Sequence, residues 1–174
     1  MSDTFITVMA IMVAAVVLFA IPIMATASQN DNITQSAVQT LVSNFVNTAA
    51  REGKITQSNY NDFIQELYAT GNSYQVDLEV QTLADNPGKK GTAGESIQVI
   101  GESIYYSEFT NTIENEIKTN GVKKLKQGDY VLAKVQNTNV TMGTKIKNFL
   151  YTIVGKDTIA IEASASALVS TTGK

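Results

Sequence analysis

The sequence predicts an α+β protein: a long N-terminal membrane helix continues into an amphipathic helix, which packs on a small, mostly antiparallel sheet with additional helices. Three observations predict this class. The run Phe5–Ala27 carries no charged side chain. An apolar stripe with helical spacing follows it closely. Three later stretches alternate between apolar and polar residues, as half-buried strands do. Residues 28–174 are enough for one domain of ordinary size, so we expect a single α+β head behind the apolar helix.

The apolar run is long enough to cross a membrane. As a helix that rises ~1.5 Å per residue, its 23 residues span about 34 Å, against a hydrocarbon layer of ~30 Å. Eleven of its positions are Ile, Val, Leu or Phe, and these favour insertion by about 3–6 kcal/mol. The residues expected to face lipid or neighbouring helices are Phe5, Ile6, Val8, Ile11, Val13, Val16, Val17, Leu18, Phe19, Ile21, Pro22 and Ile23.

Two interpretations of residues 1–27 compete. The small-x-small triplet Ala25–Ala27 resembles a signal-peptidase site. However, no Lys or Arg precedes the apolar run, and the run is longer than the roughly 7–15 residues of a usual signal core. We therefore expect a retained anchor, with residues 28–174 as an extracytoplasmic head. A secreted protein that has lost residues 1–27 is the alternative.

Residues 28–52 are expected to continue the anchor as an amphipathic helix that packs on the head. Apolar residues recur here at spacings of one, three and four, which is typical of one helical stripe. The predicted head-packing residues are Ile33, Val38, Leu41, Phe45 and Val46. Pro22 would remove one backbone hydrogen bond and kink the long helix, and Gly53 would end it.

The rest of the chain is expected to alternate helices with strands. Thr56 is placed to cap a second helix that stops at Gly71, and residues 73–83 alternate like a strand with one wet face. Residues 84–94 form a Pro/Gly/Lys loop, Ile97 and Val99 suggest a short strand, and a third helix runs from Ser103 to about Gly121. The last predicted elements are a strand over 130–136, a helix over 140–154 and a strand over 158–170, whose three alanines would let a helix approach the sheet closely.

Charge is distributed unevenly along the chain. Residues 1–117 hold four Lys/Arg and 13 Asp/Glu, a net charge of −9, whereas residues 118–174 hold nine Lys and three Asp/Glu, a net charge of +6; the whole chain carries −3. The two parts could form complementary faces of neighbouring subunits. The alternative is that both charge sets are solvated surface and cancel within one domain.

Composition argues against an enzyme and against a cofactor. The chain contains neither His nor Cys, so catalytic arrangements based on these residues and thiolate metal sites are excluded. Glu108, Glu114 and Glu116 are expected on the solvated face of a helix, and Asp85 lacks the spacing of an EF-hand. The lysine cluster Lys118, Lys123, Lys124 and Lys126 is interpreted as a solvated turn. We expect no nucleic acid, because this cluster has no Arg and the pI is near 4.9, and no small-molecule substrate.

The order of these segments resembles that of pilins and pseudopilins. More specifically, SDTFITVMAIMVAAVVLFAIPIMA and QSAVQTLVSNFVNTAAREGKIT are similar to small anchored proteins encoded with tight-adherence (Tad-type) pili of Gram-positive bacteria. The similarity continues through YNDFIQELYATGNSYQVDLEVQ, NPGKK and NFLYTIVGKDT, nearly the whole chain. It implies a non-enzymatic subunit of a cell-surface filament or of its assembly machinery. Its expected partners are the membrane, pilin-like subunits in a homo- or hetero-oligomer, and a secretion platform.

The departures from this family favour a particular role. Pilins usually carry a basic leader and a Glu five residues into the mature helix, but here no acidic residue lies between Asp3 and Asp31. Pro22 does resemble the proline that many type IV pilins carry in this helix. A minor, tip or assembly component is therefore expected rather than the repeating shaft subunit. The alternative from another class is a membrane-tethered exported module that binds a surface, a sugar or a protein outside any filament.

Overall fold

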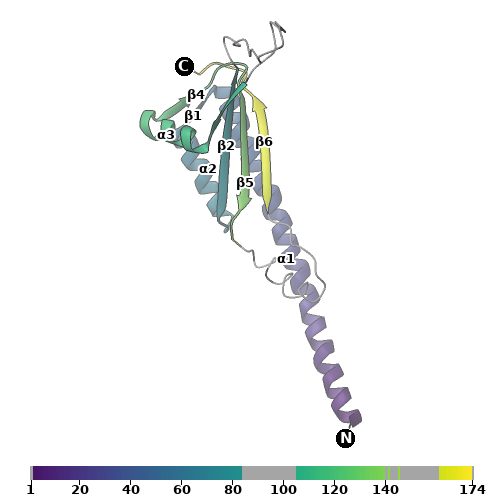
Figure 1. The fold of residues 1–174 in the computed structure, drawn as a ribbon. Coiled ribbons are helices and arrows are strands. Elements are labelled where there is room, and N and C mark those ends of the chain that lie inside the picture. The colour runs from purple at the N-terminus through teal and green to yellow at the C-terminus, as the bar shows by residue number, and fades with distance from the viewer. Residues whose placement is uncertain (1, 84–104, 140, 142–144, 146–160, 174) are drawn as a thin grey trace, which may run out of the picture.

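The long N-terminal helix organises the molecule. The computed structural model describes residues 2–83, 105–139, 141, 145 and 161–173. Helix α1 covers Ser2–Glu52 without interruption and contains Pro22. Its N-terminal part extends well away from the sheet and from the other helices, whereas its C-terminal part lies against the sheet (Figure 1). The prediction of one helix running from the apolar segment into the head is therefore confirmed.

The end of α1 leads directly into a short strand and a second helix. Gly53 takes a positive φ of 67° and donates its N–H to the Ala49 carbonyl at 2.9 Å, which closes the helix. Strand β1 is Lys54–Thr56, and helix α2 is Gln57–Ala69. The Thr56 side chain accepts a hydrogen bond from the Asn59 N–H at 3.1 Å, so the predicted N-cap is confirmed.

The main sheet has four antiparallel strands in the order β3-β2-β5-β6. Its strands are β2 (Tyr74–Leu83), β3 (Tyr105–Phe109), β5 (Tyr130–Asn137) and β6 (Glu162–Leu168). One face of β2 is buried at Tyr74, Leu78 and Val80, while Gln75 and Asp77 on the other face are exposed. The alternation predicted for this strand is confirmed.

A smaller sheet joins two short segments that are far apart in the sequence. Strand β4, Val122–Lys124, pairs antiparallel with β1. It follows helix α3, Thr110–Asn120, which ends at Gly121 with a φ of 75°. The positive φ of Gly121 suits a residue without a Cβ, so the predicted helix end at this glycine is confirmed.

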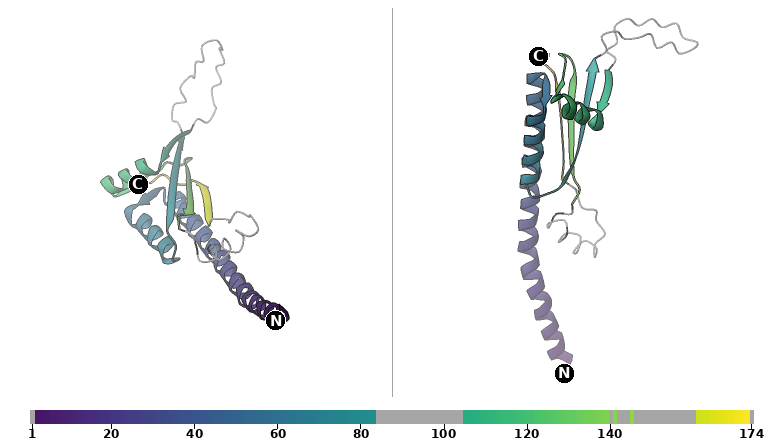
Figure 2. Two further views of the ribbon diagram at one scale, coloured as in Figure 1. Left: turned by 60° about the horizontal axis from the view of Figure 1, so that its bottom comes forward. Right: turned by 90° about the vertical axis from the view of Figure 1, so that its left-hand side faces the viewer.

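The core lies between the helices and one face of the main sheet, and Figure 2 shows α1 along that face (right-hand view). Its largest fully buried side chains come from helices, from strands and from the segment after β4: Ile55, Leu67, Leu78, Ile113, Ile117, Leu125, Val38, Val42, Val46, Val80, Val131 and Val135. Phe45 of α1 stacks on Phe63 of α2, with ring centroids 4.4 Å apart. On β6, Ala163 is buried at 1% exposure and Ala165 and Ala167 pack against the core. The small side chains allow the close approach of α1 that the sequence predicts.

Two predictions about the middle of the chain were wrong. Residues 105–109 form strand β3 rather than the first turns of a helix, because they pair with residues 79–83 of β2. The lysine-rich stretch after Gly121 contains strand β4 rather than only a turn. The predicted loop over 84–94, the strand at Ile97 and Val99, and most of the helix over 140–154 lie outside the described residues.

Candidate membrane and assembly helix

No side chain of the apolar part of α1 is fully buried in the structure of the described residues. The predicted membrane-facing side chains from Phe5 to Ile23 are all exposed, and Leu18 and Phe19 each reach 71%. An 18-residue window of this helix has a mean hydropathy of 2.8 with none of the window buried. By length and composition the helix could cross a membrane. Because it is uncovered, this apolar part is not a core helix of the domain that the structure describes.

The few polar atoms of this segment are satisfied within the helix. Thr7 Oγ1 donates to the Asp3 carbonyl at 2.8 Å, and Thr26 Oγ1 donates to the Pro22 carbonyl at 3.0 Å. In an apolar environment an unpaired hydroxyl costs several kcal/mol, roughly 2–7 by transfer measurements. The two threonines therefore add no unpaired donor to a surface that is otherwise aliphatic or aromatic.

One side of the apolar segment carries a shallow groove. It is lined by Phe5, Ile6, Met9, Ala10, Val13, Ala14 and Val17. The two alanines stand four residues apart, so they lie on one face of the helix, and the larger side chains flank them. Such a surface lets another helix approach closely.

The character of α1 changes where it reaches the head. Val38, Val42 and Val46 are at most 1% exposed, Phe45 is 7% exposed, and Leu41 packs against the core as a partly buried residue. Thus Val38, Leu41, Phe45 and Val46 occupy the positions that the sequence predicts for them. The sequence reasoning missed Val42, although its spacing of four from Val38 and Val46 carries the same signal.

Ile33 is a correction to the predicted packing set, because its side chain is 67% exposed. The contacts of α1 with the sheet begin one half-turn later: Gln35 Nε2 donates to the Glu162 carbonyl at 2.6 Å, and Gln39 Nε2 donates to the Ser164 carbonyl at 2.9 Å. The helical stripe continues through Ile33, but the described part of the head does not cover it there.

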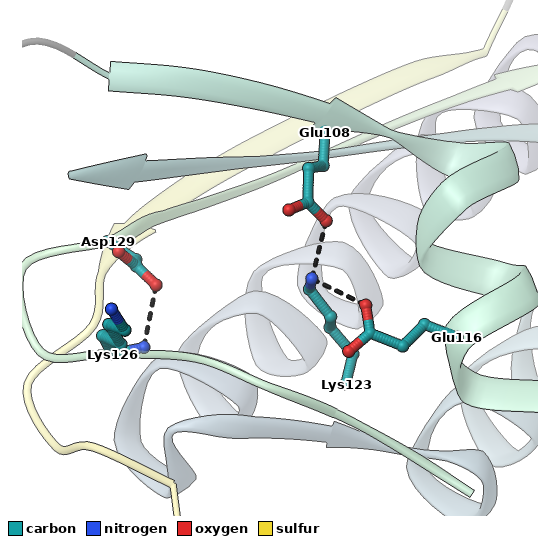
Figure 3. A network of polar contacts seen from close by, with 5 residues as sticks. All are labelled: Glu108, Glu116, Lys123, Lys126 and Asp129. Carbon is teal, nitrogen blue, oxygen red and sulfur yellow. Dashed lines mark hydrogen bonds and ion pairs between the residues drawn. The ribbon is translucent and has the colours of Figure 1, made fainter. Parts of the chain in front are cut away.

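The charged residues that the sequence placed in solvent form a partly buried network. Lys123 is only 8% exposed, and its Nζ lies 2.6 Å from Glu108 Oε2 and 2.8 Å from Glu116 Oε2. Figure 3 shows these carboxylates approaching the ammonium from β3 and from α3. Burial lowers the pKa of Lys123, but the hydrogen bonds and negative charges of the two glutamates outweigh it and raise the pKa overall. The prediction of a fully solvated cluster was therefore wrong for Lys123.

A second polar contact joins α2 to α3. Tyr60 Oη donates to Glu114 Oε1 at 2.7 Å, and Lys118 Nζ lies 3.0 Å from Glu114 Oε2. The pKa of Glu114 is lowered mainly by the hydrogen bond from Tyr60. Burial raises this pKa, and Lys118 lowers it further. Burial, followed by the bond to Glu114, raises the pKa of Tyr60. Both polar clusters tie elements of the head together.

Comparison with known protein families, with curated proteins and with solved structures finds no match to this chain. Within the described residues there is also no group of three or more acidic side chains that could hold a metal ion. The largest exposed apolar surface that the structure describes is the N-terminal half of α1.

Proposed function

We propose that this chain is a non-enzymatic structural subunit, a minor pilin or pilin-like component, of a cell-surface filament or of its assembly machinery. The membrane holds its N-terminal helix, and the head lies on the extracytoplasmic side. One observation carries the proposal: a single 51-residue helix exposes a row of large apolar side chains at one end and packs into the α+β head at the other.

The physical logic of such a subunit follows from this division of α1. In the membrane, lipid chains surround the apolar segment, so its side chains are not exposed to water. If a secretion motor lifts the subunit out, the same surface must be buried again, and a bundle of equivalent helices provides that cover. Within the described residues, the buried α1 side chains begin at Val38, so the predicted membrane-facing side chains take no part in the core and remain available for this exchange.

Electron microscopy of material sheared from the cell surface tests the proposal, with a gold-labelled antibody raised against the head. Label along or at the tip of thin filaments supports a filament subunit, and label on a membrane complex with an assembly platform supports the machinery role. A lone labelled monomer in the membrane fraction would instead favour a tethered binding module. A mature protein whose intact mass starts at Ser28 would contradict the anchor.

A further inference from the structure

Two lysines form a like-charge pair on the small sheet. Lys54 of β1 and Lys124 of β4 stand directly opposite each other in the register of the two strands. Residues opposite each other in an antiparallel pair share one face, and like charges there repel. Their neighbours Ile55 and Lys123 point into the core, so Lys54 and Lys124 face outward. Neither lysine has an ion pair in the part of the chain that the structure describes.

An acidic like-charge pair lies on helix α2. Asp62 and Glu66 are both exposed and are four residues apart, a spacing at which like charges on a helix repel. Within the described residues neither carboxylate contacts a cation. Asp62 accepts only a long hydrogen bond from Ser58 Oγ, at 3.4 Å. The fold therefore carries two unneutralised charge pairs of opposite sign.

The acidic pair lines a groove between α1 and α2. The groove holds about 180 Å³, and its lining residues are Leu41, Asn44, Phe45, Thr48, Asn59, Asp62, Phe63 and Glu66. Its walls thus combine aliphatic and aromatic side chains with two carboxylates. A lysine side chain fits this combination, because its four-carbon stem packs on apolar surface while its ammonium reaches the carboxylates.

We propose that Lys54 and Lys124 of one copy of this chain dock at the groove lined by Asp62 and Glu66 on a second copy. This contact rests on the proposed filament role and deepens it by naming a subunit interface. The charges are complementary, and the repulsion within each pair is relieved when the two pairs meet. We place this contact head-to-tail, because repetition of a head-to-tail contact that does not close generates a filament, whereas a reciprocal contact between the same two surfaces closes as a dimer.

The test measures self-association of the full-length chain in detergent micelles by sedimentation velocity. The variant K54E/K124E reverses the basic pair and is expected to weaken self-association about tenfold or more, as close charge pairs at interfaces do. Placing D62K/E66K in the same chain as K54E/K124E should restore it, because the complementarity is then re-created with opposite sign. Self-association of the unchanged chain should also weaken as salt rises.

The control K118E/K134E has the same net charge as K54E/K124E. Lys118 and Lys134 are exposed and already paired within the chain, with Glu114 and Glu162. If K118E/K134E weakens self-association as much as K54E/K124E does, the proposal is overturned, because the change in net charge alone would then explain the loss. The variant K54E/K124E/D62K/E66K provides a second check. If its circular dichroism shows a folded head but its self-association is not restored, the proposal is also overturned.

The outcome separates this interface from the proposed function. Filaments that assemble normally from K54E/K124E subunits would reject the interface and leave the filament role intact. Charge-dependent association in micelles, with no filament or assembly complex on cells, would support the interface and reject the filament role. An unchanged chain that stays monomeric in micelles but binds an anionic polymer through Lys54 and Lys124 would show a different occupant and reject the interface.

Discussion

Gln35 of α1 pairs with the backbone of Glu162 as a neighbouring strand would. Its Nε2 donates to the Glu162 carbonyl at 2.6 Å, and its Oε1 accepts from the Glu162 N–H at 3.1 Å. Gln39, one turn later, reaches the Ser164 carbonyl, and further along the edge the Ser170 N–H donates to the Ala50 carbonyl at 3.1 Å. Strand β6 is one of the two edge strands of the main sheet as the structure describes it, and an uncovered edge invites pairing with another chain. Helix α1 therefore protects β6 as well as covering the core.

Replacing Gln35 with Ala should open this edge. The change removes two hydrogen bonds, each of which contributes about 0.5–1.5 kcal/mol. Because both are exposed to solvent, we expect the head to lose an amount at the low end of their sum, about 1 kcal/mol of stability. This loss of stability should appear in hydrogen exchange, followed by mass spectrometry, as roughly fivefold faster exchange of the Glu162 amide. Gln65→Ala, at an exposed position of α2, is the control. Equal exchange at β6 in both variants would show that Gln35 does not protect the edge.

Gly53 should be far more sensitive to substitution than Gly71. Both have positive φ, 67° and 83°, and such a conformation costs a residue with a Cβ roughly 1–2 kcal/mol. A Cβ on Gly71 would meet nothing, but one on Gly53 would run into the backbone of Thr171, Thr172 and Gly173. We therefore expect Gly71→Ala to lose about 1–2 kcal/mol and Gly53→Ala clearly more, as a lower midpoint of thermal unfolding. Equal losses would mean that the C-terminal residues do not pack on Gly53.

Helices and strands whose apolar residues repeat over many positions were predictable from the sequence. Elements that are very short, or whose apolar spacing fits both a helix and a strand, were not. The strand from Tyr74 to Leu83 alternates over ten residues, so its face and bounds follow from period two. Tyr105 and Phe109 are four apart, which suits a helix, but four is also an even number and places both side chains on one face of a strand. Strands β1 and β4 have three residues each, too few to show any period.

The buried lysine was unpredictable for a different reason. A Lys-Lys pair at 123–124 is indistinguishable in sequence from solvated surface. Lys123 is buried because Glu108 and Glu116 come from other elements, 15 and 7 residues away in the sequence, and the strand register turns Lys123 inward while Lys124 faces out. The exposed state of Ile33 likewise depends on where the sheet ends, which the helical period does not encode.

Lys123→Met should destabilise the head even though Met has a similar volume. The change leaves Glu108 and Glu116 close together without their cation, and removing one member of a buried pair costs about 3–5 kcal/mol. Both carboxylates are about one-third exposed, so we expect a smaller loss of about 1–3 kcal/mol in urea unfolding. Lys118→Met, at a 62% exposed side chain, should cost well under 1 kcal/mol. Recovery in the triple variant with Glu108→Gln and Glu116→Gln would confirm that the stranded charges cause the loss.

Tyr60→Phe should reduce stability in a pH-dependent way. The hydrogen bond from Tyr60 holds the pKa of Glu114 below its usual range, so the folded state binds this proton more weakly than the unfolded state. Such a contribution is present above the ordinary Glu pKa of about 4.3 and is lost as pH falls through the lower folded-state value. Unfolding midpoints of the two proteins should therefore differ most near neutral pH and converge in acid. Tyr68→Phe, at an exposed tyrosine, should change little at any pH, and a Tyr60→Phe difference that grows in acid would contradict the assignment.

Leu18→Lys should block assembly without unfolding the head. Leu18 is 71% exposed and lies in the uncharged run Phe5–Ala27 of α1. A lysine near the middle of a membrane helix costs roughly 2.5–3.5 kcal/mol on insertion scales. In the part of the chain that the structure describes, the buried α1 side chains begin at Val38, so the circular dichroism and the thermal midpoint of the head should stay unchanged. Ser36→Lys adds the same charge to the same helix at an exposed position beyond the apolar segment, and it should assemble normally. Immunogold counts on sheared surface material and on membranes measure how much of each variant is incorporated. Normal incorporation of Leu18→Lys subunits would show that the apolar half of α1 is not the assembly surface.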